Sequence, residues 1–145
     1  MMESYYTALR LNPGLVLKGV LWHQGENDVG NYSYHHDLHT FITNVREDVL
    51  NVNLPFICGT MLKSYKDGNY NTQYVDMVHK DLPNTVWLTD CVVLDDLVSP
   101  DMQSDFIHFS AKAQRIMGIR YFEAFKKVEQ RLVTALEEWN KLNST

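Results

Sequence analysis

Several features that would place this chain in a specialised class are absent from its sequence. It has only 2 cysteines in 145 residues, Cys58 and Cys91. That is too few for a disulfide framework or a four-ligand zinc site, so we expect two free, buried thiols. No apolar run approaches the roughly 18 residues that a membrane span needs. The first residues, MMESYYTALR, are amphipathic and lack the apolar core of a signal peptide, so they assign no compartment.

Clustered positive charge is scarce as well. The formal net charge is −5, and Lys126 and Lys127 are the only adjacent basic residues. Nucleic acids and anionic membranes bind proteins through a clustered basic face, so the sequence predicts neither partner. The hydrophobic share of 45% and the charged share of 21% are ordinary for a globular domain of this length.

What the sequence does contain is an alternation of short apolar runs with segments of helical periodicity. We expect strands from Leu15 to Trp22 and at residues 55–60 and 85–88, and helices at residues 36–49 and 72–82. Pro83 would end the second of these helices. Ser110 is a suitable N-cap for a last helix whose apolar stripe continues to Trp139. Strands that alternate with helices predict an α/β fold, a three-layer α/β/α sandwich around a parallel sheet.

Ligand sites of open parallel sheets lie beyond the carboxyl ends of the strands. Three expected loops fall there: residues 23–31, 61–70 and 89–109. Loops of this length in a compact domain are usually functional.

The first of these loops opens with a polar block, Trp-His-Gln-Gly-Glu-Asn-Asp, at residues 22–28. Gln24 brings amide donors, Gly25 permits close backbone approach, and Glu26 brings a carboxylate. Such a group could place a donor at a developing oxyanion while a carboxylate orients a base. By itself, the block is more typical of a polar turn between a strand and a helix.

A second block, Asp105-Phe-Ile-His108, precedes the last helix. An aspartate three residues before a histidine can hydrogen-bond one imidazole nitrogen and leave the other free as a general base. The pattern is common by chance, and its place at the expected ligand edge is what favours a function.

Together the two blocks resemble the sialate O-acetylesterase and acetylxylan esterase family of the SGNH hydrolase superfamily. The matching segments are LKGVLWHQGEND and DFIHFSAKAQRIMGIRYFEAF, about eighty residues apart. The resemblance implies a flavodoxin-like parallel sheet. It also implies hydrolysis of O-acetyl esters on acetylated carbohydrates or sialic acid by a serine nucleophile, without a metal or other cofactor.

The resemblance assigns roles to residues of both blocks. His108 would be the general base, and Gln24, with Gly25, would help to hold the oxyanion. The carboxylate that orients the imidazole would be either Asp105, from the Asp-x-x-His element, or Glu26, from the Gln-Gly-Glu element.

One part of the family pattern is missing. Family members carry the nucleophile serine near the N-terminus in a Gly-Gln-Ser-Asn-like block, and no such block occurs here. Ser64 and Ser104 are expected on ligand-edge loops, but nothing in their sequence context supports either as a replacement. We therefore interpret residues 1–145 as the C-terminal portion of one hydrolase domain and expect no meaningful esterase activity from the isolated chain.

Two alternatives belong to other classes: a non-catalytic sugar-binding or interaction module of the same fold, and a sugar O-acetyltransferase. If the first strands of the sheet are missing, the strand from Leu15 to Trp22 is an apolar edge. We then expect self-association, or binding of a complementing N-terminal fragment, through that edge.

Overall fold

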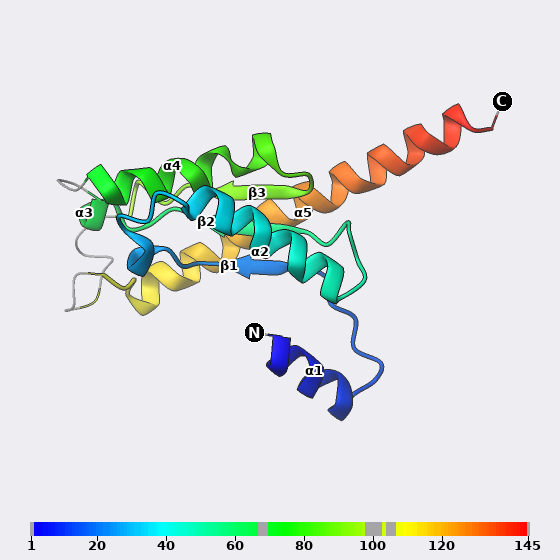
Figure 1. The fold of residues 1–145 in the computed structure, drawn as a ribbon, viewed down its shortest axis with the longest axis horizontal. Helices are drawn as coiled ribbons and strands as arrows, with labels where there is room; N and C mark the ends of the chain where they lie inside the picture. The colour runs from blue at the N-terminus through cyan, green and yellow to red at the C-terminus, as the bar shows by residue number, and fades with distance from the viewer. Residues whose placement is uncertain (1, 67–69, 98–102, 104–106, 145) are drawn as a thin grey trace.

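The computed structural model of the chain describes residues 2–66, 70–97, 103 and 107–144 (Figure 1). Within them the elements follow one another as α1 (Met2–Leu11), β1 (Val20–Trp22), the 3-10 helix η1 (Glu26–Asp28), α2 (Tyr34–Asp48), β2 (Phe56–Gly59), α3 (Lys63–Lys66), α4 (Tyr70–Thr85), β3 (Thr89–Val92) and α5 (Ala111–Leu142). None of the described helices is both long and apolar enough to cross a membrane.

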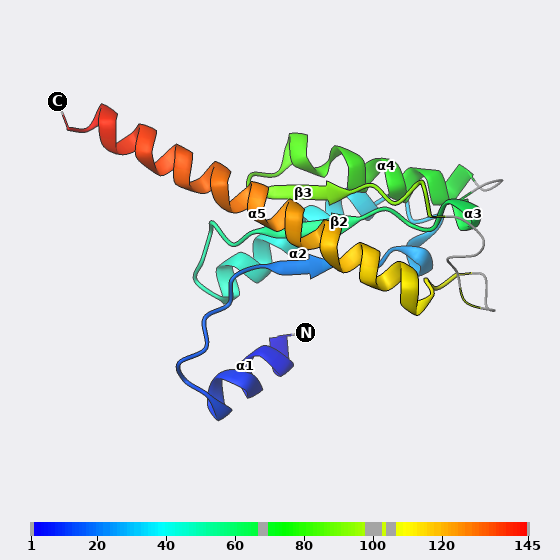
Figure 2. The same ribbon diagram turned by 180° about the vertical axis from the view of Figure 1, so that it is seen from behind.

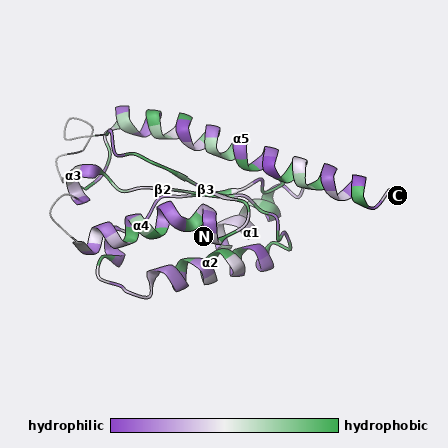
Figure 3. Ribbon diagram, turned by 90° about the horizontal axis from the view of Figure 1, so that it is seen from above, coloured by the Kyte–Doolittle hydropathy of each residue, from purple (hydrophilic) through white to green (hydrophobic). Residues whose placement is uncertain are grey.

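The three strands form a parallel sheet in the order β1-β2-β3. Helices α2 and α4 lie on one face of this sheet and α5 lies on the other (Figure 3). The predicted α/β class and three-layer arrangement are confirmed. In the described part of the chain, β1 and β3 are the edge strands, and β2 lies between them.

Two apolar clusters fill the spaces between the layers. Phe56 and Cys58 pack with α2 and α4, whereas Ile57 packs with α5 on the opposite face. Because successive side chains of a strand point to opposite faces, β2 contributes to both clusters and is completely buried. Its register places Cys58 opposite Cys91 of β3. Both thiols are free as predicted, but only Cys58 is buried, since Cys91 lies on an edge strand.

The first and third strands differ from the sequence-based boundaries. The ordered first strand begins at Val20, and Leu15 and Val16 are exposed. The predicted third strand at residues 85–88 is wrong. Thr85 ends α4, Leu88 has a left-handed φ of 54°, and the strand follows it as Thr89–Val92. An apolar run at the turn between a helix and a strand has the same pattern as a short buried strand, which explains the error.

The ends of α4 and α5 can be compared with the helix ends predicted from the sequence. The prediction that Pro83 ends the helix is wrong, since Pro83 lies inside α4 and the helix continues to Thr85. The N-cap prediction is confirmed, since the Ser110 side chain accepts a hydrogen bond from the Ala113 N–H at 3.2 Å. Helix α5 crosses the sheet and then continues beyond it (Figure 2), which leaves Leu136 and Trp139 exposed.

Candidate functional site

The first block, and His108 of the second, lie at the carboxyl edge of the sheet. Trp22 ends β1, the turn at residues 23–25 follows, and Glu26 begins η1. Helix α5 starts at the same edge, toward which β1 and β3 point (Figure 1), so His108 precedes its first turn there. This is the ligand edge that parallel sheets of this type use.

A ring contact links the first block to the residue that follows the second. The imidazole of His23 lies edge-on to the buried ring of Phe109, with ring centroids 5.3 Å apart and planes at 74°. Phe109 follows His108 directly, and the His108 side chain is exposed at this edge. Its carbonyl accepts a hydrogen bond from the Gln103 N–H at 2.7 Å. Asp105, the other residue of the second block, lies outside the described residues.

The Gln-Gly-Glu turn has a backbone that only glycine adopts readily. Gly25 has a φ of 144°, and a Cβ added there would lie 2.7 Å from Cγ1 of Val75. Beside it, Gln24 donates from Nε2 to the Asp28 carboxylate at 2.5 Å. An amide nitrogen carries two N–H donors, so this bond leaves a second N–H for another acceptor. Glu26 is half-buried, and its negative charge acts on His23.

Two tyrosines hold the backbone of the first block from opposite sides of the sheet. From α5, the Tyr121 hydroxyl donates to the Trp22 carbonyl at 2.8 Å and lies 3.0 Å from Nδ1 of His23. From α2, the Tyr34 hydroxyl donates to the Gln24 carbonyl at 3.2 Å. It also lies 2.8 Å from Nε2 of His79. Burial raises the pKa of each tyrosine, so both hydroxyls keep their protons.

The two histidines of these contacts are uncharged at neutral pH. Burial lowers the pKa of His79 to about 4, and His79 has no exposed surface. Burial also lowers the pKa of His23, although Glu26 and Asp76 oppose that change. A neutral imidazole can donate a hydrogen bond through one nitrogen and accept one through the other, so both histidines are suited to hold the block by hydrogen bonds.

Comparison with known proteins identifies the family of this chain. Residues 1–127 match the family described as carbohydrate esterase, sialic acid-specific acetylesterase. The chain belongs to this family. The matched residues include both blocks and the tyrosines and histidines around them.

One solved structure has a similar fold. The X-ray structure of a protein from Arabidopsis thaliana is similar to this chain, with a TM-score of 0.69 and 28% sequence identity. The similarity covers 85% of this chain and 50% of the Arabidopsis chain, so this chain spans about half the length of that relative. None of the curated proteins matches.

A partly buried ion cluster lies at the same edge of the sheet. Lys66, which is 7% exposed, contacts Asp76 and Asp95 at 2.5 Å each. Asp76 also accepts the Met61 N–H at 2.9 Å, and Lys80 contacts Asp95 at 2.9 Å. The cluster ties the loops after β2 and β3 to α4, so it fixes two of the three loops at the ligand edge.

Sequence reasoning assigned no role to Tyr121, His79 or Asp76. The sequence could have indicated them, because each is a polar residue at a helix position that the structure buries. A buried hydroxyl, imidazole or carboxylate requires partners. The replacement serines stay predictions: the Ser64 side chain and all of Ser104 lie outside what the structure describes.

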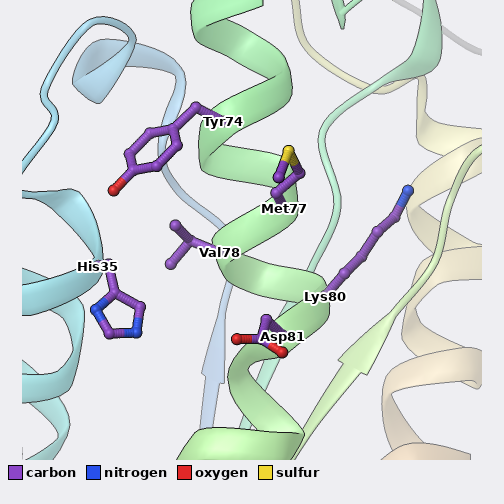
Figure 4. A pocket seen from close by; sticks show the side chains of 6 residues that line it. All are labelled: His35, Tyr74, Met77, Val78, Lys80 and Asp81. Carbon is purple, nitrogen blue, oxygen red and sulfur yellow. The ribbon is translucent and has the colours of Figure 1, made fainter.

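A groove between two helices lies outside this site. It has a volume of about 500 Å³ and lies between α2 and α4, lined by His35, Tyr74, Met77, Val78, Lys80 and Asp81 (Figure 4). Neither block contributes to its lining. Within the described residues, no group of three or more His, Cys, Asp or Glu side chains is arranged to hold a metal ion.

Proposed function

We propose that this chain supplies the acid–base part of a carbohydrate O-acetyl esterase site that acts by a Ser-His-Asp/Glu mechanism. The contact between His23 and Phe109 carries the proposal, because it brings the first block to the residue that directly follows His108 at the ligand edge. Family membership supports the reaction class. The substrates would be acetylated sugars, including acetylated xylan or O-acetyl sialic acid.

In this proposal His108 accepts the proton of the nucleophile serine as that serine attacks the acetyl carbonyl. It then returns the proton to the leaving sugar hydroxyl, so one residue acts as base and then as acid. The acyl-enzyme is hydrolysed by water in the reverse proton sequence. An N–H of Gln24, with the backbone at Gly25, stabilises the oxyanion that forms in each step.

The carboxylate that orients His108 is either Asp105 or Glu26. The half-buried position of Glu26 at the ligand edge supports its candidacy, and the Asp-x-x-His pattern supports Asp105. The two are separated by comparing Asp105→Asn with Glu26→Gln in an active form of the enzyme. Loss of the orienting carboxylate lowers kcat by about 10⁴-fold, and loss of the other has a much smaller effect.

The nucleophile is the component that the sequence of residues 1–145 does not contain in a recognisable block. We expect the chain alone to hydrolyse neither 4-nitrophenyl acetate nor acetylated xylan. Fusion to an N-terminal segment of a family member that carries a Gly-Gln-Ser-Asn-like block should restore turnover. Robust turnover by the chain alone, abolished by Ser64→Ala or Ser104→Ala, would refute this assignment.

The catalytic role of His108 is tested in that fusion. His108→Ala should abolish turnover and leave the circular dichroism spectrum and the unfolding midpoint unchanged, since the side chain is exposed. The matched control is His36→Ala, an exposed histidine on α2, which should retain turnover. Sugar binding without any turnover would indicate a binding module. Acetyl transfer to an added sugar in preference to water would indicate an acetyltransferase.

We also propose that β1 is the surface for self-association or for a complementing N-terminal fragment. It pairs with β2 on one side only in the described sheet, and Leu21 at its centre is 61% exposed. Unpaired backbone groups on an apolar edge favour strand addition. Leu21→Lys should reduce association in size-exclusion chromatography. A monomer at all accessible concentrations, without binding of the fragment, would refute the proposal.

A further inference from the structure

We infer that Tyr121 is a positioning residue that fixes the His108 block relative to the Gln24 block. Its hydroxyl contacts the last residue of β1 and the residue after it, while the start of its own helix follows His108. The inference rests on the proposed function, because it names what holds that site together.

The hydrogen-bonding capacity of Tyr121 determines the tautomer of His23. A tyrosine hydroxyl has one proton, and here it donates to the Trp22 carbonyl at 2.8 Å. The second contact, 3.0 Å to Nδ1 of His23, therefore needs a proton from the imidazole. His23 is then protonated on Nδ1 and carries a lone pair on Nε2. That Nε2 is buried without a partner among the described residues, which a lone pair tolerates better than an N–H donor.

The end of β2 is shaped around this pair. Gly59 lies beneath Tyr121 and His23, and a Cβ added there would overlap the tyrosine hydroxyl and lie 3.1 Å from Nδ1 of the histidine. A glycine at this strand end thus allows the two side chains to meet across the edge of the sheet.

Two contacts along one helix are what make Tyr121 a positioning residue. Phe109, just before α5, packs on the His23 ring, and Tyr121 reaches the same histidine from three turns further along the helix. The apolar face of α5 packs on β2 and β3, and these two contacts add an aromatic and a polar link from the first half of the helix to the end of β1. The position of His108 then follows from that of Gln24.

The test uses nitrogen NMR of the imidazole rings in the full chain, without substrate, at about neutral pH. We expect His23 to be protonated on Nδ1 in the unmodified chain. Tyr121→Phe keeps the ring in the core but removes the hydroxyl, so the Nε2-protonated tautomer should become populated. Amide exchange at residues 23–26 should accelerate about tenfold, because the Trp22 carbonyl and the imidazole both lose a partner.

Three further variants separate positioning from a general loss of stability. Tyr74→Phe removes a hydroxyl that likewise donates to a backbone carbonyl, that of Tyr32 at 3.1 Å, and it should leave His23 and residues 23–26 unchanged. His23→Asn places an N–H where Nδ1 was and should keep the slow exchange, whereas His23→Gln should lose it.

An Nε2-protonated His23 in the unmodified chain would overturn the inference. Equal effects of Tyr121→Phe and Tyr74→Phe would also overturn it. Neither outcome depends on esterase turnover, so a failure here and a failure of the proposed function are distinguishable.

Discussion

Acid should destabilise this fold through His79, by an amount that its burial allows us to work out. The side chain has no exposed surface, and burial lowers its pKa from 6.5 to about 4. A histidine in the unfolded chain takes up a proton near pH 6.5, whereas the folded chain resists protonation until about pH 4. The unfolded state therefore binds more protons between these values, and the free energy of unfolding falls as the pH decreases through that window.

The size of the effect follows from the same two values. At 1.36 kcal/mol per pH unit, the full loss from neutral pH to below pH 4 is about 3 kcal/mol, and the loss by pH 5 is about 2 kcal/mol. Above pH 6.5 the imidazole is neutral in both states, so the stability is fully present there. A loss of this size is a large part of the free energy of unfolding of a small domain, which is roughly 5–15 kcal/mol.

The variant His79→Gln isolates this contribution from that of every other titrating group. Gln can still hydrogen-bond Tyr34 but cannot take up a proton. We expect it to cost about 1–2 kcal/mol at neutral pH through imperfect packing and hydrogen bonding. Relative to the unmodified chain, its free energy of unfolding should rise by about 2 kcal/mol between neutral pH and pH 5, so that at pH 5 it equals or exceeds that of the unmodified chain; carboxylates titrate alike in both proteins and cancel.

Urea unfolding followed by tryptophan fluorescence provides the measurement, at neutral pH and at pH 5, with matching slopes required for the comparison. His36→Gln, at an exposed position of α2, controls for the effect of the His-to-Gln exchange itself. The reasoning is refuted if the free energy of unfolding of His79→Gln differs from that of the unmodified chain by the same amount, with the same sign, at both pH values.

Three further predictions concern stability and use the same urea titrations. Gly25→Ala should cost about 1–3 kcal/mol, because Gly25 has a φ of 144° and an added Cβ would press on Val75. Gly118→Ala should stabilise the chain by about 0.5–1 kcal/mol, because Gly118 lies in α5 with open space around it. Equal effects of the two substitutions would contradict the strain argument. Asp76→Asn should cost about 3 kcal/mol by leaving a buried lysine without its main partner, whereas Asp96→Asn, in an exposed pair, should cost less than about 1 kcal/mol. Ser110→Ala should cost about 1 kcal/mol through loss of the N-cap, and an unchanged unfolding midpoint would contradict that role.

The outline of the fold was predictable because it depends on local periodicity. The apolar spacing of α2 and α5 and the apolar run of β2 require burial on particular faces, and a parallel three-layer arrangement is the common way to satisfy all of them. Boundaries were less predictable. At residues 85–88 an apolar run belongs to a helix end and a turn, because the burial of Leu88 does not require an extended backbone.

The site was predictable only as a location and a family. The Trp22–Asp28 block and the His108 block could be placed at one edge because each follows or precedes an expected element there, and family membership is confirmed over residues 1–127. The roles of His108, Asp105, Glu26, Gln24 and Gly25 remain predictions of that resemblance.

The sequence by itself thus determined the α/β class, the family, and the edge of the sheet at which both blocks lie. Only the tertiary structure decided which polar groups meet at that edge, above all the Tyr121 hydroxyl between Trp22 and His23. The reason is physical. Periodicity records whether a side chain is buried, but a hydrogen bond between residues 98 positions apart depends on how strands and helices pack. Tyr121 matches the apolar stripe of α5 as well as any hydrophobic residue would, and only its position over Gly59 gives its hydroxyl a partner.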